Sequence, residues 1–145
     1  MKAIKIITHP FILIISFLFI LISGQHWGGF YLLYLLLALP HGGIHAVLAL
    51  AGIAILIFTY LRFLRSNKYL IEPVLNIIGS VCLVLSVFLF FYNDKQGYNN
   101  GTFEQLVPQI TLALFGILTI AFIIRNLAKS HSDKPVNGNL SLRKI

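Results

Sequence analysis

Three histidines are the residues whose type and spacing could support chemistry. His41 and His45 are four positions apart, so a helix through both would place both imidazoles on one face. His26 precedes the apolar stretch of residues 28–65 that contains His41 and His45. The orientation expected from the lysine and arginine residues places all three histidines on the outer side of a membrane. Imidazoles gathered there would suit a zinc or copper ion, with Asp94 or Glu104 as further ligands. A histidine-based metal site is therefore one functional hypothesis.

Haem is a variant of this hypothesis, because two histidines from different helices at matching depth could ligate its iron. His26 with either His41 or His45 meets that requirement. In the structural alternative, each histidine only hydrogen-bonds a neighbouring carbonyl near the membrane interface. The H-x-x-x-H spacing lacks the glutamate of the H-E-x-x-H zinc motif, so the sequence leaves these interpretations open. We expect His45 to face other helices and to have a polar partner, since Ala49 and Gly52 continue its face.

Polar residues inside the apolar segments give a second set of candidates. Asn76 and Ser80 share a helical face, and such groups usually hydrogen-bond across helices, although they could also line a path for a small solute. Glu72 is expected to be a helix-start charge near Arg65 or Lys68. The sequence contains no phosphate-binding loop, dinucleotide motif or nucleophile–base pair, which favours a protein without enzymatic activity of its own.

The stretch that must position the histidines covers residues 28–65 and carries no charge before Arg62. As one straight helix it would be about 57 Å long, against a hydrocarbon core of about 30 Å. Pro40 removes a backbone donor and is followed closely by Gly42 and Gly43, so we predict a break there. Residues 29–39 are then a short apolar helix, too short to span, and the alternative is one bent helix over residues 29–64.

The whole chain predicts an all-α membrane protein. Its 145 residues are 58% hydrophobic and 10% charged, whereas soluble domains carry about 25% charged residues. We predict four transmembrane helices in a bundle, with the short helix before the second span. The spans lie at about residues 3–23, 43–64, 72–92 and 103–125, and the last has capping-box spacing from Thr102 to Gln105. This bundle occupies residues 1–127, and residues 128–145 are expected to be a disordered basic cytoplasmic tail.

Lysine and arginine set the expected orientation in the cell membrane. With both termini in the cytoplasm, the inner side receives ten of the eleven Lys and Arg residues and the outer side receives only Lys95. A five-span topology would move Lys2 and Lys5 to the wrong side. The net charge of +7 is confined to segments that flank apolar runs, which favours anionic lipid over nucleic acid as its partner.

These observations favour a multi-pass membrane protein that is a structural or partner-binding subunit or a small transport component. The alternative function is the metal or haem site of His26, His41 and His45. The expected partners are the lipid bilayer, anionic lipid at the basic inner face, and either a second copy of the chain or another membrane protein. The single cysteine, Cys82, excludes a disulfide framework and a cysteine-based zinc site within one chain.

Overall fold

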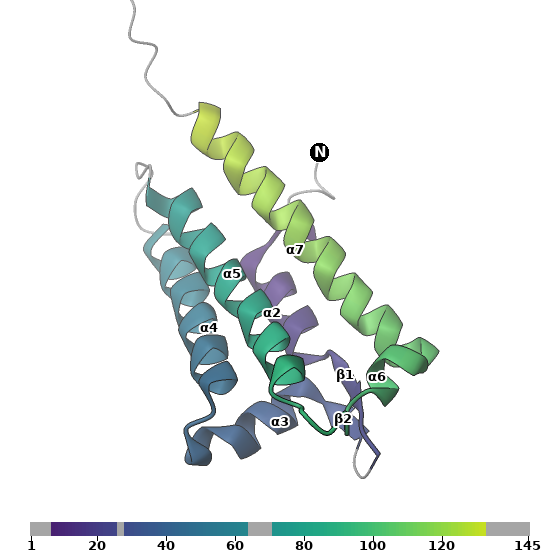
Figure 1. Cartoon of the computed structure of the whole chain (residues 1–145). Coiled ribbons are helices and arrows are strands. Elements are labelled where there is room, and N and C mark those ends of the chain that lie inside the picture. The colour runs from purple at the N-terminus through teal and green to yellow at the C-terminus, as the bar shows by residue number, and fades with distance from the viewer. Residues whose placement is uncertain (1–6, 26–27, 64–70, 133–145) are drawn as a thin grey trace, which may run out of the picture.

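The structure is a computed structural model that describes residues 7–25, 28–63 and 71–132. Figure 1 shows a group of long helices with a small two-stranded ribbon and a short helix at one end. In chain order, the elements are α2 (Pro10–Leu18), β1 (Leu21–Ser23), β2 (Gly28–Phe30), α3 (Tyr31–Ala38), the 3-10 helix η1 (Leu39–His41), α4 (Ile44–Phe63), α5 (Ile71–Tyr92), α6 (Gly101–Glu104) and α7 (Leu106–Ser132).

Three of these helices are long and apolar enough to cross a membrane. Within the described residues, the candidate spans are Ile44–Arg62, Ile71–Tyr92 and Leu106–Ser130. Large apolar side chains remain exposed along all three. On α7 these are Leu106, Val107, Ile110, Leu114, Ile117, Ile120, Ile124 and Leu127. The chain is therefore mostly helical, with three candidate spans and an apolar outer surface, consistent with an all-α membrane protein.

The first predicted span, residues 3–23, is not one continuous helix. Within the described residues α2 ends at Leu18, and the chain then becomes extended as β1, which pairs antiparallel with β2. The helix begins with Pro10 at its first position and His9 as the N-cap. His9 Nδ1 accepts a hydrogen bond from the Phe11 amide at 3.3 Å. The four-helix count of the sequence prediction is therefore not confirmed, and the three candidate spans are α4, α5 and α7.

Side chains from the far end of the sequence hold β1 extended. The Leu21 amide donates to Thr111 Oγ1 at 3.0 Å, and the Ser23 amide donates to Thr102 Oγ1 at 2.9 Å. These hydroxyls replace the carbonyls that a continued helix would have offered. Thr102 lies inside α6, where its hydroxyl binds Ser23, so it does not cap the last predicted span. That span begins as α7 at Leu106, after an extended Gln105.

The predicted break at Pro40–Gly43 is confirmed, and a single bent helix over residues 29–64 is wrong. After η1 the chain passes through Gly42 in the left-handed region at φ +66°, and the Gly43 amide donates to the Ala38 carbonyl at 3.1 Å. Helix α4 begins only at Ile44. The short apolar helix expected at residues 29–39 is present as α3 with η1, and it lies across the end of α4 (Figure 1).

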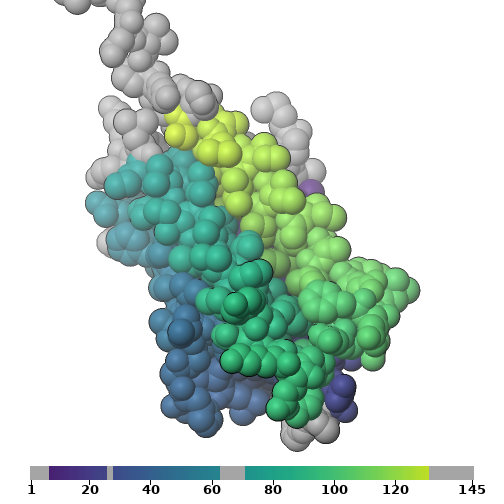
Figure 2. Space-filling view, in the orientation of Figure 1, coloured from purple at the N-terminus to yellow at the C-terminus, as the bar shows by residue number. Residues whose placement is uncertain are grey.

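The long helices meet through small residues and an aromatic-rich core. At the crossing of α4 and α5, Gly52 faces Gly79, and a Cβ added to Gly52 would lie only 2.8 Å from the Gly79 carbonyl oxygen. Farther across the bundle, Phe17 of α2 packs against Phe115 of α7, with ring centroids 5.6 Å apart. Figure 2 shows α5 and α7 lying along one another on the face it presents.

The two ends of the bundle differ in charge. We call the end that carries Arg62, Arg125 and Lys129 the basic end, and the end that carries β1, β2 and α3 the ribbon end (Figure 1). At the ribbon end, Lys95 is the only lysine or arginine among the described residues. Helix α7 continues to Ser132, beyond the predicted start of the tail, and residues 133–145 lie outside the described residues.

Candidate functional site

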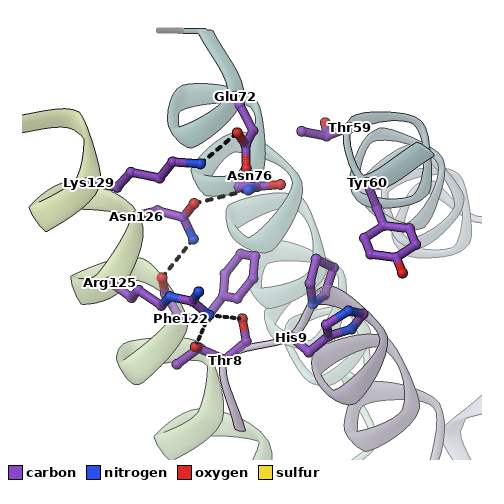
Figure 3. Close-up of a pocket in the computed structure, with 11 residues that line it drawn as sticks. Thr8, His9, Thr59, Tyr60, Glu72, Asn76, Phe122, Arg125, Asn126 and Lys129 are labelled. Atoms are coloured by element: carbon purple, nitrogen blue, oxygen red, sulfur yellow. Dashed lines mark hydrogen bonds and ion pairs between the residues drawn. The ribbon is translucent and has the colours of Figure 1, made fainter. Parts of the chain in front are cut away.

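A polar pocket at the basic end is the candidate functional site. It has a volume of about 400 Å³ and is lined from four segments of the chain: the start of α2, the end of α4, the start of α5 and the end of α7. Figure 3 shows these side chains converging from their separate helices. The lining residues are Thr8, His9, Pro10, Thr59, Tyr60, Glu72, Asn76, Phe122, Arg125, Asn126 and Lys129.

An ion pair joins α5 to α7 at this pocket. Lys129 Nζ donates to Glu72 Oε2 at 2.7 Å, and the glutamate side chain is only 14% exposed. The sequence suggested Arg65 or Lys68 as neighbours of Glu72, and both lie outside the described residues. A partly buried carboxylate this close to an ammonium group holds the two helices in register, because separating the pair would leave a poorly solvated charge.

Two buried asparagines form a second link between the same helices. Asn76 Nδ2 donates to Asn126 Oδ1 at 3.0 Å, and Asn126 Nδ2 donates to the Phe122 carbonyl at 2.8 Å. A carbonyl can only accept, so the second bond fixes which way the Asn126 amide points. Asn76 must then present its Nδ2 to Asn126, and its Oδ1 is left buried without a partner among the described residues.

The start of α2 closes the third side of the pocket. Arg125 Nη1 donates to the Thr8 carbonyl at 3.2 Å and also to the Thr8 hydroxyl. The His9 ring lies edge-on to Tyr60 of α4, with centroids 5.0 Å apart. Through these contacts the residues before α2 are attached to both α4 and α7. The pocket therefore depends on all four segments being assembled.

Beyond the pocket, the middle of the bundle is filled mainly by apolar side chains. Moving from the pocket toward the ribbon end, each segment next contributes buried carbon-rich side chains: Leu13 and Phe17 of α2, Leu56 of α4, Leu83 of α5 and Phe115 of α7. The buried Ser80 and Thr119 hydroxyls donate to carbonyls of their own helices, Ile77 and Phe115. They thus offer no hydrogen-bonding path between the two ends. The arrangement suits binding of a polar group at one end.

The structure places the two predicted histidine ligands that it describes on different elements. His41 lies on η1 and is exposed, with its Nδ1 2.9 Å from the Leu37 carbonyl oxygen. His45 lies in the first turn of α4, where its ring packs edge-on against Phe90 at 5.5 Å. Gly42 interrupts the chain between them, so the single helix that would place both imidazoles on one face is absent.

The third predicted ligand, His26, lies outside the described residues. Among residues 7–25, 28–63 and 71–132, no three histidine, cysteine, aspartate or glutamate side chains gather closely enough to hold a metal ion. The metal or haem site of His26, His41 and His45 therefore stays a prediction. His45 does face neighbouring helices as expected, but its Nε2 is buried without a hydrogen-bond partner among the described residues, so the expected polar partner is not found.

A separate polar cluster joins α3, α4 and α5 near the ribbon end. Ser86 Oγ donates its one proton to the His45 carbonyl at 2.7 Å. The Tyr31 hydroxyl therefore donates its own proton to Ser86, whose carbonyl oxygen lies 3.1 Å and whose Oγ lies 2.9 Å from the phenol oxygen. Tyr31 is fully buried, with its ring edge-on to Phe17 and Phe90. Every oxygen in this cluster already has a protein partner. Its role is therefore to attach α3 to the long helices.

Sequence reasoning identified one pocket residue for the right reason, since Asn76 was expected to hydrogen-bond across helices. It missed Arg125 and Asn126, which look like the ordinary end of a span. The signal was the amide side chain of Asn126, between Arg125 and Lys129 near the end of α7, which antiparallel packing of α5 and α7 places beside Asn76. Comparison with protein-family models, with curated proteins and with solved structures found no match to this chain.

Proposed function

We propose that this chain is a multi-pass protein of the cell membrane that acts as a partner-binding subunit, without catalysis of its own. The observation that carries the proposal is the pocket at the basic end, which four segments build around buried amides and an ion pair. Polar groups buried between apolar helices are costly, and Asn76 Oδ1 has no partner among the described residues, so the pocket is best explained by a ligand. The exposed apolar sides of α4, α5 and α7 support placement in a bilayer.

In this proposal the first segment is a fourth crossing, part helical and part extended. Nine residues of α2 rise about 14 Å, and the three residues of β1 add about 10 Å. Together with the residues between them, this approaches the thickness of the hydrocarbon core. Extended backbone at that depth requires protein partners, and Thr111 and Thr102 supply them.

Both termini and the basic end are proposed to face the cytoplasm. The support is the charge distribution: ten Lys and Arg residues fall on that side and Lys95 on the other. On this topology the loop after α5 is extracellular.

Thiol labelling of intact cells tests this orientation. In a Cys82→Ser background, we expect Gln96→Cys to react with a membrane-impermeant maleimide added outside. Ser132→Cys should react only after the membrane is permeabilised. Labelling of Ser132→Cys in intact cells would contradict the topology, and labelling of both sites after permeabilisation controls for their intrinsic reactivity.

A small transport component is the second candidate, and the apolar interior disfavours it. Solute crossing would require polar groups or water along the bundle, whereas Phe17, Leu83 and Phe115 are each at most 3% exposed in its centre. Binding at one end needs no such path.

Flux measurements separate these two functions. We expect vesicles that contain the purified full chain to release K⁺, protons or a small uncharged solute no faster than protein-free vesicles. A known channel in parallel vesicles serves as the positive control. A protein-dependent flux that Thr119→Val or Ser80→Ala alters would establish transport and contradict the binding function.

A further inference from the structure

We propose that the pocket at the basic end holds the headgroup of an anionic phospholipid that carries hydroxyl groups as well as its phosphate, as a phosphoglycerol headgroup does. The phosphate is placed beside Arg125 and Lys129, and a headgroup hydroxyl donates to Asn76 Oδ1. This inference rests on the proposed function, because the proposed topology puts the basic end in the headgroup layer of the cytoplasmic leaflet.

The charged residues that line the pocket favour an anionic ligand. Arg125 and Lys129 are four residues apart on α7 and therefore share one face, while Glu72 is the only carboxylate among the lining residues. The lining thus holds two cations against one anion. A guanidinium group beside an ammonium group is well suited to phosphate oxygens, since both offer charged N–H donors.

The need for a hydroxyl comes from Asn76. Its side chain is 95% buried (5% exposed), it lines the pocket, and its Oδ1 has no partner among the described residues. Figure 3 shows that oxygen directed away from Asn126, toward the side of the pocket where Thr59 lies. Thr59 cannot satisfy it in this arrangement, because its hydroxyl proton goes to the Ile55 carbonyl at 2.7 Å. The pocket therefore leaves one buried acceptor available to a donor from a bound molecule.

The place for the acyl chains comes from the aromatic rim between α2 and α4. Phe11 is exposed and stands edge-on to Tyr60, with centroids 5.0 Å apart, and Tyr60 itself lines the pocket. Aromatic residues at this depth are typical of the boundary between headgroups and hydrocarbon. A lipid can thus place its headgroup in a pocket of about 400 Å³ while its chains lie along the apolar outer surface.

The test measures lipid binding by the full chain in nanodiscs or detergent, using native mass spectrometry and thermal stability. We expect phosphatidylglycerol to bind more tightly than phosphatidylcholine or phosphatidylethanolamine and to raise the unfolding temperature. Arg125→Gln should lower the phosphatidylglycerol affinity about tenfold, as expected for lost hydrogen bonds to a charged group.

The matched control is Arg62→Gln. It removes the same charge at the same end, but Arg62 lies outside the pocket, with its guanidinium over the Phe58 ring. Equal loss of affinity in both variants would mean general attraction to the basic surface and would overturn the site.

The hydroxyl requirement has its own test. The double variant Asn76→Leu/Asn126→Leu removes Asn76 Oδ1 together with Asn126 Oδ1, the acceptor that loss of Asn76 Nδ2 would leave unpaired. We expect this variant to fold and to lose the preference for phosphatidylglycerol over phosphatidic acid, which has no glycerol headgroup. An unchanged preference would overturn the role of Asn76 Oδ1.

Free glycerol 3-phosphate distinguishes a lipid from a soluble ligand. Its saturable binding at lipid-like affinity would show that the pocket takes a water-soluble phosphate compound and would overturn the lipid assignment. A failure of the proposed function would instead be seen in the flux measurement, which uses no added anionic lipid.

Discussion

Replacing Gly52 with alanine is expected to destabilise the protein markedly, whereas the same replacement at Gly116 is not. The Cβ added at Gly52 would lie 2.8 Å from both the Gly79 carbonyl oxygen and Leu83 Cδ2, so α4 and α5 would have to separate. Overpacking of a tightly packed interior costs about 1–3 kcal/mol. At Gly116 nothing lies within 4 Å of the added atom, and alanine favours a helix over glycine by up to about 1 kcal/mol.

Both glycines lie within candidate spans, so the pair isolates the effect of available space. The measurement is thermal unfolding in detergent, followed by circular dichroism and by loss of soluble protein on heating. We expect a fall of several degrees for Gly52→Ala and no fall for Gly116→Ala. Equal behaviour of the two variants would mean that the crossing of α4 and α5 is looser than the structure has it.

The second large effect is expected at the asparagine pair. Asn126→Leu alone should destabilise the protein by about 1–3 kcal/mol, because it leaves Asn76 Nδ2 buried without an acceptor. Asn76→Leu alone should cost less, since it also removes the Oδ1 that has no partner. In the double variant the two apolar side chains can pack against each other, so most of the loss should be recovered.

The four proteins of this double-mutant cycle are compared by the same unfolding measurement. The coupling energy is the change in unfolding free energy of the double variant minus the sum of the changes in the two single variants. A coupling near zero would show that the two amides do not interact. Ser80→Ala is a suitable control, because the Ser80 hydroxyl bonds only within its own helix, to the Ile77 carbonyl.

The apolar composition and the helix-breaking proline and glycine residues predicted much of the fold. Long uncharged runs indicate membrane helices, because a backbone without internal hydrogen bonds is costly in lipid. Helices α4, α5 and α7 coincide closely with three of these runs. Pro40 with Gly42 and Gly43 predicted the end of α3, because proline and a left-handed glycine act on the backbone locally. Such local effects can be inferred from a short window of sequence.

The features that sequence reasoning missed depend on residues far apart in the chain. Leu21 and Ile22 fit a helix and a strand equally well, and the choice is made by Thr111, which is 90 positions away. Likewise, nothing near Arg125 indicates that Thr8 will accept its hydrogen bonds, 117 positions earlier. The i, i+4 spacing of His41 and His45 indicates a common face only within one helix, and the break predicted at Pro40, Gly42 and Gly43 places these two residues on η1 and α4.

The hydroxyl contacts of β1 constrain the order in which the protein can be made. The first segment is synthesised early, but the Thr102 and Thr111 side chains that satisfy its Ser23 and Leu21 amides are synthesised about 80 to 90 residues later. Until α7 has entered the bilayer, those amides have to be satisfied by water, by the insertion machinery or by a temporary helix. Residues 21–23 therefore reach their final conformation only once α6 and α7 are in place.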